Sequence, residues 1–164
     1  MNVNIKDYYR KKNIEERNKW FNMFFVNNNM ERLNVEEIKV GLDICFDLFK
    51  ENFYNNEYDE FVLIADICES LVNEYLKKKE WEDITQSYED VDFLIDIVCF
   101  VYELTYKYVE KTDILKKIID TETVDVRIKI RALENILVNE PAIKLYLKND
   151  YEKYSLLLKN IKNN

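Results

Sequence analysis

Apolar residues between positions 34 and 54 recur every three or four residues, which is the period of an α-helix with one buried face. They are Val35, Ile38, Leu42, Cys45 and Phe49. Asn34 precedes this stripe and Glu37 stands three residues later, the spacing of a reciprocal N-cap. The pattern predicts a long helix that begins after Asn34 and ends at the pair Asn55 and Asn56.

A second stripe with the same period follows directly. Its members are Phe61, Ile64, Cys68, Leu71 and Tyr75. The three lysines at positions 77–79 stand where the negative end of a helix dipole favours cations. The sequence therefore predicts a second long helix that ends in these lysines.

A third stripe begins after Ser87, whose spacing to Asp90 again fits an N-cap. The stripe consists of Leu94, Ile97, Val101, Leu104 and Tyr108. Further apolar residues between positions 93 and 102 cover other faces of the same helix. A helix that is apolar on several faces has neighbours on more than one side, so we expect this one at the centre of the core.

Beyond Thr112 the pattern predicts shorter helices at 112–120, 123–138, 141–148 and 150–161, each introduced by a capping residue or by Pro141. One segment is ambiguous, because apolar residues alternate with polar ones from Val124 to Ile130, as in a strand. No second segment of that kind offers a partner strand, and the same residues also fit a helix. We therefore favour a helix here.

The chain contains one glycine, Gly41, and one proline, Pro141, in 164 residues. Tight turns in sheets depend on these two residue types, so their scarcity strengthens the helical interpretation. We predict an all-α fold, a compact single-domain helical bundle over residues 1–164. Three long helices in residues 34–110 follow a basic N-terminal segment, 1–33, and precede the shorter helices of 111–164. No segment is long and apolar enough to cross a bilayer, so we expect no membrane association.

Histidine is absent, which excludes His-based catalytic triads and helical Glu-x-x-His metal sites. A single glycine excludes glycine-rich phosphate loops. We therefore predict a protein that is not an enzyme and that binds no cofactor and no metal. Cys45, Cys68 and Cys99 lie in apolar stretches at wide spacing, which indicates reduced, buried thiols rather than a zinc site or a disulfide framework.

The N-terminal residues include no apolar segment typical of a secretory signal, so we expect a cytoplasmic protein, in the producing cell or in an infected host. Lysine outnumbers arginine by 19 to 5, and asparagine, isoleucine and tyrosine are abundant. These preferences follow A/T-rich codons and indicate an A/T-rich genome, such as that of a low-GC bacterium, its phage or plasmid, or a large DNA virus.

The net charge of −8 conceals an uneven distribution. Residues 1–33 carry 7 basic and 4 acidic side chains, net +3; residues 34–110 carry 6 basic and 20 acidic, net −14; residues 111–164 carry 11 basic and 8 acidic, net +3. Such acidity either solvates exposed helix faces or forms a field that steers a basic partner.

The second interpretation leads to our functional hypothesis. An acidic surface suits a stoichiometric inhibitor of a protein with a basic surface, such as a nuclease or a nucleic-acid-binding effector. Immunity, antitoxin, anti-defence and host-modulating viral proteins all work in this way. Tyrosine and tryptophan beside the acids, Tyr54 and Tyr58 among them, are typical binding anchors. The predicted partner-binding residues are Glu57, Asp59, Glu60, Trp81, Glu82, Asp83, Tyr88, Glu89 and Asp92.

Other functions stay open. A helical adaptor of a larger complex would instead expose a contiguous apolar patch, and self-association into a homo-oligomer fits either function. The basic stretch 8–12, with Trp20, and the patch of Arg127, Lys129 and Arg131 have the composition of nucleic-acid contacts, but the overall acidity opposes that role. The acidic pair Asp92 and Asp96 lies one helical turn apart and is expected to be solvated rather than to chelate a cation.

Overall fold

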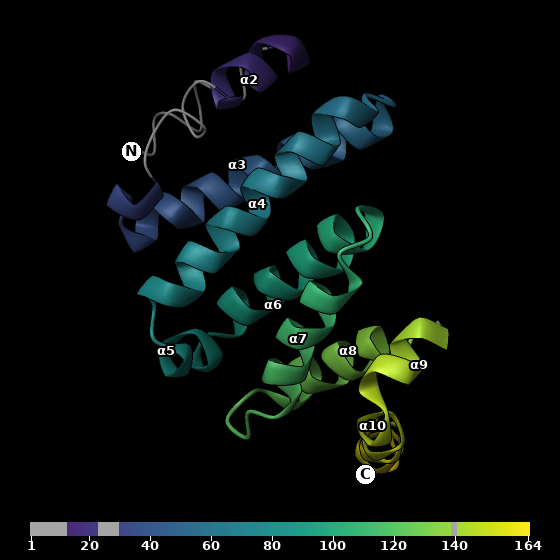
Figure 1. Ribbon diagram of the computed structural model, residues 1–164. Coiled ribbons are helices and arrows are strands. Elements are labelled where there is room, and N and C mark those ends of the chain that lie inside the picture. Colours follow the sequence, from purple (N-terminus) through teal and green to yellow (C-terminus); the bar gives the residue numbers. More distant parts are fainter. Residues whose placement is uncertain (1–12, 23–29, 139–140) are drawn as a thin grey trace. The chain divides into compact units, whose positions relative to one another are not determined.

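Every regular element in the described part of the chain is a helix. The computed structural model describes residues 13–22, 30–138 and 141–164 (Figure 1). The α-helices are α2 (Ile14–Phe21), α3 (Val35–Tyr54), α4 (Tyr58–Lys78), α5 (Trp81–Gln86), α6 (Tyr88–Ile97), α7 (Tyr108–Ile119), α8 (Val126–Ile136), α9 (Pro141–Leu147) and α10 (Asn149–Lys162). A 3₁₀ turn, η2, covers Met30–Arg32, and a π-helical segment, η3, covers Val98–Tyr102. The all-α prediction is confirmed, and none of the described helices combines the length and apolar character needed to cross a membrane.

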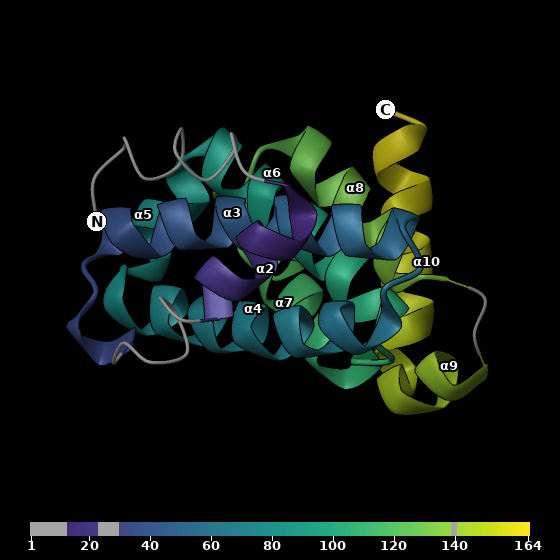
Figure 2. The same cartoon turned by 90° about the horizontal axis from the view of Figure 1, so that it is seen from above.

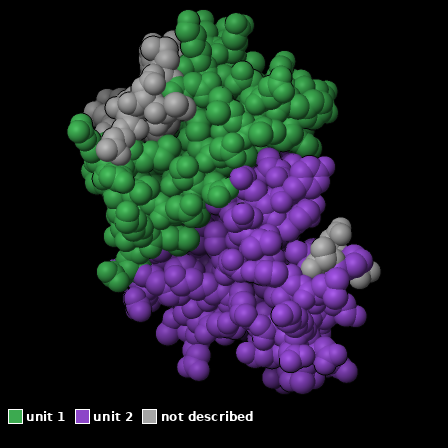
Figure 3. Space-filling model, in the orientation of Figure 1, with its two compact units in different colours: residues 1–80 green, residues 81–164 purple. Residues whose placement is uncertain are grey.

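The helices fall into two compact units, residues 1–80 and residues 81–164 (Figure 3). The first unit contains α2, α3 and α4, and the second contains α5 to α10. Each unit has buried apolar side chains of its own. That the whole chain forms one domain stays a prediction.

In the first unit, α3 and α4 lie side by side along their length (Figures 1 and 2). All but one of the predicted stripe residues face the interior: Ile38, Leu42, Cys45, Phe49, Phe61, Ile64, Cys68, Leu71 and Tyr75 are buried. The exception is Val35, the first residue of α3, which is only half-buried. The N-cap is also as predicted, because the Glu37 amide donates to Asn34 Oδ1 at 2.9 Å and the Asn34 amide donates to Glu37 Oε1 at 3.2 Å. These two bonds satisfy amide groups that the first helical turn leaves without partners.

Helix α2 packs on α3 through a buried pair of amide side chains. Asn18 Nδ2 donates to Asn52 Oδ1, and Asn52 Nδ2 donates to Asn18 Oδ1, each at 2.9 Å. Asn52 also donates to the carbonyl of Leu48 at 2.8 Å, and both asparagines are buried. Buried amides are costly unless they are hydrogen-bonded. The reciprocal pair forms only when Asn18 lies opposite Asn52, so it fixes the position of α2 along α3.

In the second unit, the third predicted helix begins at Ser87 as expected, with the Asp90 amide donating to Ser87 Oγ at 3.3 Å. It does not continue as an α-helix to Glu110. The π-helical segment Val98–Tyr102 interrupts it, a turn follows at Tyr106, whose φ is 62°, and α7 begins at Tyr108. A π-helical turn bonds residue i to i+5, which changes the face that later residues occupy. Leu94, Ile97 and Val101 are buried as predicted, whereas Leu104 is only half-buried.

Two short helices lie where the sequence pattern predicted none. Helix α2 falls within the basic N-terminal segment, and α5 lies between the second and third predicted helices. Helix α5 is held by Ile84, whose side chain is fully buried. The remaining predicted helices are present with ends shifted by a few residues, and Val126 to Ile130 is helical rather than extended.

Helix α10 is fastened to the rest of the second unit by polar contacts. The buried Tyr154 hydroxyl donates to Asp120 Oδ1 at 3.0 Å, and Lys116 Nζ lies 2.6 Å from Asp150 Oδ2. Burial, and the hydrogen bond that it donates to Asp120, raise the pKa of the Tyr154 phenol above that of a free tyrosine.

This pKa shift predicts a loss of stability in alkali. Tyr154 keeps its proton to a higher pH in the folded than in the unfolded chain, so its contribution is complete below about pH 10 and is lost as the pH rises further. As the pH rises from about 9 to about 11, we expect the free energy of unfolding to fall less in Tyr154→Phe than in the parent. Urea unfolding across this range measures it, with Tyr106→Phe as an exposed control. Equal pH profiles for the parent and Tyr154→Phe would contradict the prediction.

Candidate protein-binding surface

The nine predicted partner-binding residues are divided between the two units. Glu57, Asp59 and Glu60 lie at the start of α4 in the first unit. The other six lie on α5 and α6 in the second unit. The predicted residues therefore form two groups, three in the first unit and six in the second.

In the second unit, Trp81 has contacts within the fold. Its indole Nε1 donates to Thr121 Oγ1 at 2.9 Å, and Lys117 Nζ lies 4.4 Å from the ring centroid. The side chain is half-buried under these contacts. Its polar edge and its ring thus both have partners inside the unit, and a role of Trp81 in partner binding stays a prediction.

Tyr88 also has a partner within the unit. The Arg127 guanidinium carbon lies 4.5 Å from the Tyr88 ring centroid, and Arg127 in turn donates to both carboxylate oxygens of Asp125 at 3.0 Å. The hydrogen bonds from Arg127 lower the pKa of Asp125. This arrangement ties the start of α6 to the start of α8.

Asp92 and Asp96, one turn apart on α6, are joined by a single arginine. The guanidinium of Arg131 on α8 donates to both carboxylates, and also to the backbone carbonyl of Asp92 at 3.1 Å. The pair is therefore not freely solvated, because one arginine donates hydrogen bonds to both carboxylates and offsets one of their two charges. Of the six predicted residues in this unit, Glu82, Asp83 and Glu89 are exposed and have no ion pair among the described residues.

These pairings also bear on nucleic-acid binding. In the patch of Arg127, Lys129 and Arg131, both arginines are engaged by carboxylates of the same unit. A phosphate would have to displace those carboxylates. The other predicted contact, the basic stretch 8–12, lies outside the described residues.

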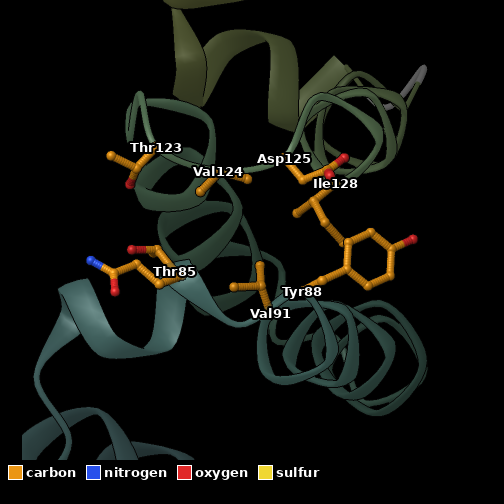
Figure 4. Close-up of a pocket in the computed structure, with 8 residues that line it drawn as sticks. Thr85, Tyr88, Val91, Thr123, Val124, Asp125 and Ile128 are labelled. Carbon is orange, nitrogen blue, oxygen red and sulfur yellow. The ribbon is translucent and has the colours of Figure 1, made fainter.

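A pocket of about 240 Å³ opens beside Tyr88 in the second unit (Figure 4). Val91 from α6 and Ile128 from α8 line it together with Val124. Among its polar side chains, the Thr85 hydroxyl donates to the carbonyl of Trp81 at 3.0 Å, and the Asp125 carboxylate accepts from Arg127. Both groups therefore have hydrogen-bond partners within the second unit.

The thiols are structural in character. Cys45 and Cys68 are buried, and Cys45 Sγ donates to the carbonyl of Ile64 at 3.3 Å. Cys99, predicted to be buried, is half-buried, and its surroundings raise the pKa of its thiol to about 11, chiefly through desolvation. Burial also raises the pKa of the Cys45 thiol. Protonated thiols are poor nucleophiles and poor metal ligands. In residues 13–22, 30–138 and 141–164, no cluster of acidic or cysteine side chains is arranged to hold a metal ion.

In the first unit, two tyrosines project from the turn between α3 and α4. Tyr54, the last residue of α3, is 71% exposed, and Tyr58, the first residue of α4, is 57% exposed. Between them Asn56 adopts the left-handed conformation with φ 59°, which asparagine tolerates better than most residues. The Tyr58 hydroxyl donates to Asn56 Oδ1 at 3.0 Å, so the side chain is held against the turn.

Both exposed rings rest on a cluster of phenylalanines that reaches into the core. Tyr54 meets Phe53 edge to face at 5.5 Å between centroids, and Tyr58 meets Phe61 at 5.4 Å. Phe61 in turn contacts Phe53 at 6.2 Å and the fully buried Phe49 at 5.4 Å. Edge-to-face contacts of this kind fix ring orientation, so the tyrosines are presented by a rigid base.

Acidic and aliphatic side chains are also exposed in the first turns of α4. Glu57 and Asp59 are exposed, Glu60 is half-buried, and the aliphatic pair Val62 and Leu63 is 49% and 42% exposed. Residues 51–66 contain five acids and no base. We call the following residues the turn surface: Tyr54, Glu57, Tyr58, Asp59, Val62 and Leu63. Among the described residues, no cation pairs with Glu57 or Asp59.

Sequence reasoning identified most of this surface but missed Val62 and Leu63. Both positions fall beside the buried stripe of α4 rather than on it, and this spacing was the available signal that they point outward.

No protein family, curated protein or solved structure compared with the chain gives a match.

Proposed function

We propose that this chain is a non-catalytic protein that binds a basic macromolecular partner through the turn surface. The observation that carries the proposal is the exposure of Tyr54 and Tyr58 on an aromatic base, next to Glu57 and Asp59, which pair with no cation among the described residues. Tyrosine is enriched among residues that dominate binding energy, and exposed carboxylates raise the rate of encounter with a basic surface.

The two kinds of side chain have different tasks in this proposal. The acids attract the partner over distances comparable to the Debye length, about 8 Å at physiological salt. The tyrosines and the aliphatic pair then bury apolar area and slow dissociation. Stoichiometric binding of this kind suits an inhibitor of the immunity, antitoxin, anti-defence or host-modulating viral type. Nucleases and nucleic-acid-binding effectors are proposed targets because they carry basic surfaces.

The test begins by identifying the partner at the turn surface. A photo-crosslinking amino acid at position 58, introduced in cells of the source organism, should capture a basic protein, whereas the same probe at Tyr88 should not. Association rates are then measured for the purified pair at two salt concentrations.

We expect Glu57→Lys with Asp59→Lys to slow association about tenfold or more, because steering by charge accounts for factors of that size. The matched control is Glu82→Lys with Asp83→Lys, which makes the same charge change at exposed positions of the other unit. It should leave the association rate within about twofold of the parent. Equal slowing by both variants, or rates that salt does not affect, would contradict the proposal.

A structural adaptor in a larger complex is the second proposal, supported by the exposed aliphatic pair Val62 and Leu63. An adaptor would contact its complex chiefly through apolar area. Val62→Ser with Leu63→Ser would then abolish binding, while the charge-reversal pair would change it little. The opposite order of effects favours the inhibitor.

A further inference from the structure

A second exposed apolar surface lies in the other unit, where α9 and α10 enclose a groove of about 480 Å³. The groove is lined by Pro141, Lys144, Leu145, Lys148, Tyr151 and Glu152. Leu145 is 76% exposed, and Lys144 Nζ lies 5.4 Å from the centroid of the Tyr151 ring. Apolar and cationic side chains therefore line the same opening.

The charge of this region is opposite to that of the turn surface. Residues 141–164 contain five lysines and two acids, whereas residues 51–66 contain five acids and no base. Of the two acids, Asp150 is paired with Lys116. In the groove, Lys144 and Lys148 outnumber the one acid, Glu152. The two surfaces also match in kind, because each sets exposed apolar side chains beside charges of a single dominant sign.

We propose that the α9–α10 groove binds the turn surface of a second copy of this chain. Val62, Leu63 and the tyrosines of one copy cover Leu145 and Tyr151 of the other, while Glu57 and Asp59 face Lys144 and Lys148. The contact joins different surfaces of the two copies, so its two halves are not related by symmetry within one contact. This proposal goes beyond the proposed function: self-association covers the turn surface when no partner is present, and a partner has to displace the second copy.

A charge exchange tests this proposal. Molar mass is measured by sedimentation equilibrium over a range of concentrations for the parent and three variants. One carries Lys144→Glu with Lys148→Glu, one carries Glu57→Lys with Asp59→Lys, and one carries all four changes. We expect the parent to exceed the monomer mass as concentration rises and each two-residue variant to stay monomeric. The four-residue variant should associate again.

The four-residue variant is informative because its net charge equals that of the parent, −8. Recovery in it therefore reflects the pairing of the two surfaces and not a general change in repulsion. Lys153→Glu with Lys159→Glu, exposed on α10 outside the groove, makes the same charge change as the groove variant and should associate like the parent. Circular dichroism verifies that each variant is folded.

A parent that is monomeric at all concentrations would overturn the proposal, as would association that neither two-residue variant reduces. Failure of the four-residue variant to recover would also overturn it. The outcome is separate from that of the proposed function, because Lys144→Glu with Lys148→Glu leaves the turn surface intact. That variant should still bind the external partner at the parent rate or faster.

Discussion

Replacing Phe49 by alanine is expected to lower the free energy of unfolding by about 3 to 5 kcal/mol, the range measured for aromatic residues deleted from cores. Phe49 is fully buried on α3 and meets Phe61 of α4 edge to face at 5.4 Å. Its removal leaves a cavity at the contact of the two longest described helices and withdraws the base on which the exposed tyrosines rest. Total stabilities are about 5 to 15 kcal/mol, so the loss is a large part of what holds the unit folded.

Urea unfolding measures this effect. A Trp81→Phe background leaves Trp20 as the only tryptophan, so that the fluorescence reports on the first unit. Phe46→Ala is the matched control, since it makes the same chemical change on the same helix at a half-buried position. It should cost clearly less than Phe49→Ala. Similar losses at the two positions would mean that Phe49 is not at the centre of this core.

In the second unit, we expect Ile97→Ala to cost about 2 to 5 kcal/mol and Leu104→Ala to cost less than 2 kcal/mol. The sequence pattern assigns both residues to one buried stripe. In the structure Ile97 is fully buried, whereas Leu104 follows the π-helical segment and keeps contact with solvent. Truncating a half-buried leucine removes less apolar area from the interior, and solvent rather than a cavity fills the space.

The comparison uses Trp81 fluorescence in a Trp20→Phe background, so that the signal comes from the second unit. The ratio of the two losses is the informative quantity. An uninterrupted α-helix from Ser87 to Glu110 would place both residues on one face and make the losses similar. Comparable losses would therefore argue against the π-helical segment.

The helices α3 and α4 could be predicted almost residue by residue, because their apolar stripes are regular and the Asn34 cap depends on neighbours three residues away. The break after Ile97 could not. A π-helical turn arises from packing on several sides. Because apolar residues cover every face of this segment, its sequence pattern does not reveal that the buried face shifts after the π-helical turn. Helix α2 is held by the pairing of Asn18 with Asn52, residues 34 positions apart, and no local pattern announces such a pair.

The same difference between local and long-range contacts separates the candidate binding residues into two groups. Tyr54, Tyr58, Glu57 and Asp59 depend on one turn, and their exposure follows from local sequence. Trp81, Tyr88 and Asp92 are engaged by Thr121, Arg127 and Arg131, each about 40 residues further along the chain. Charge and aromatic content identified these residues as candidates for binding. Only the fold shows that their partners lie in the same unit.

The amide pair of Asn18 and Asn52 has a consequence for sequence evolution. Replacing one asparagine by leucine removes both bonds of the pair, so polar atoms of the remaining buried amide lose their partner, although Asn52 keeps its bond to the Leu48 carbonyl. This loss costs about 1 to 3 kcal/mol, whereas replacing both asparagines by apolar residues of similar size is close to neutral. Each single change is thus selected against, and the double change is tolerated. Across homologous chains, positions 18 and 52 should therefore vary together, as two hydrogen-bonding residues or as two apolar ones. A lineage that crosses from one state to the other must pass through a less stable intermediate, so such crossings should be rare.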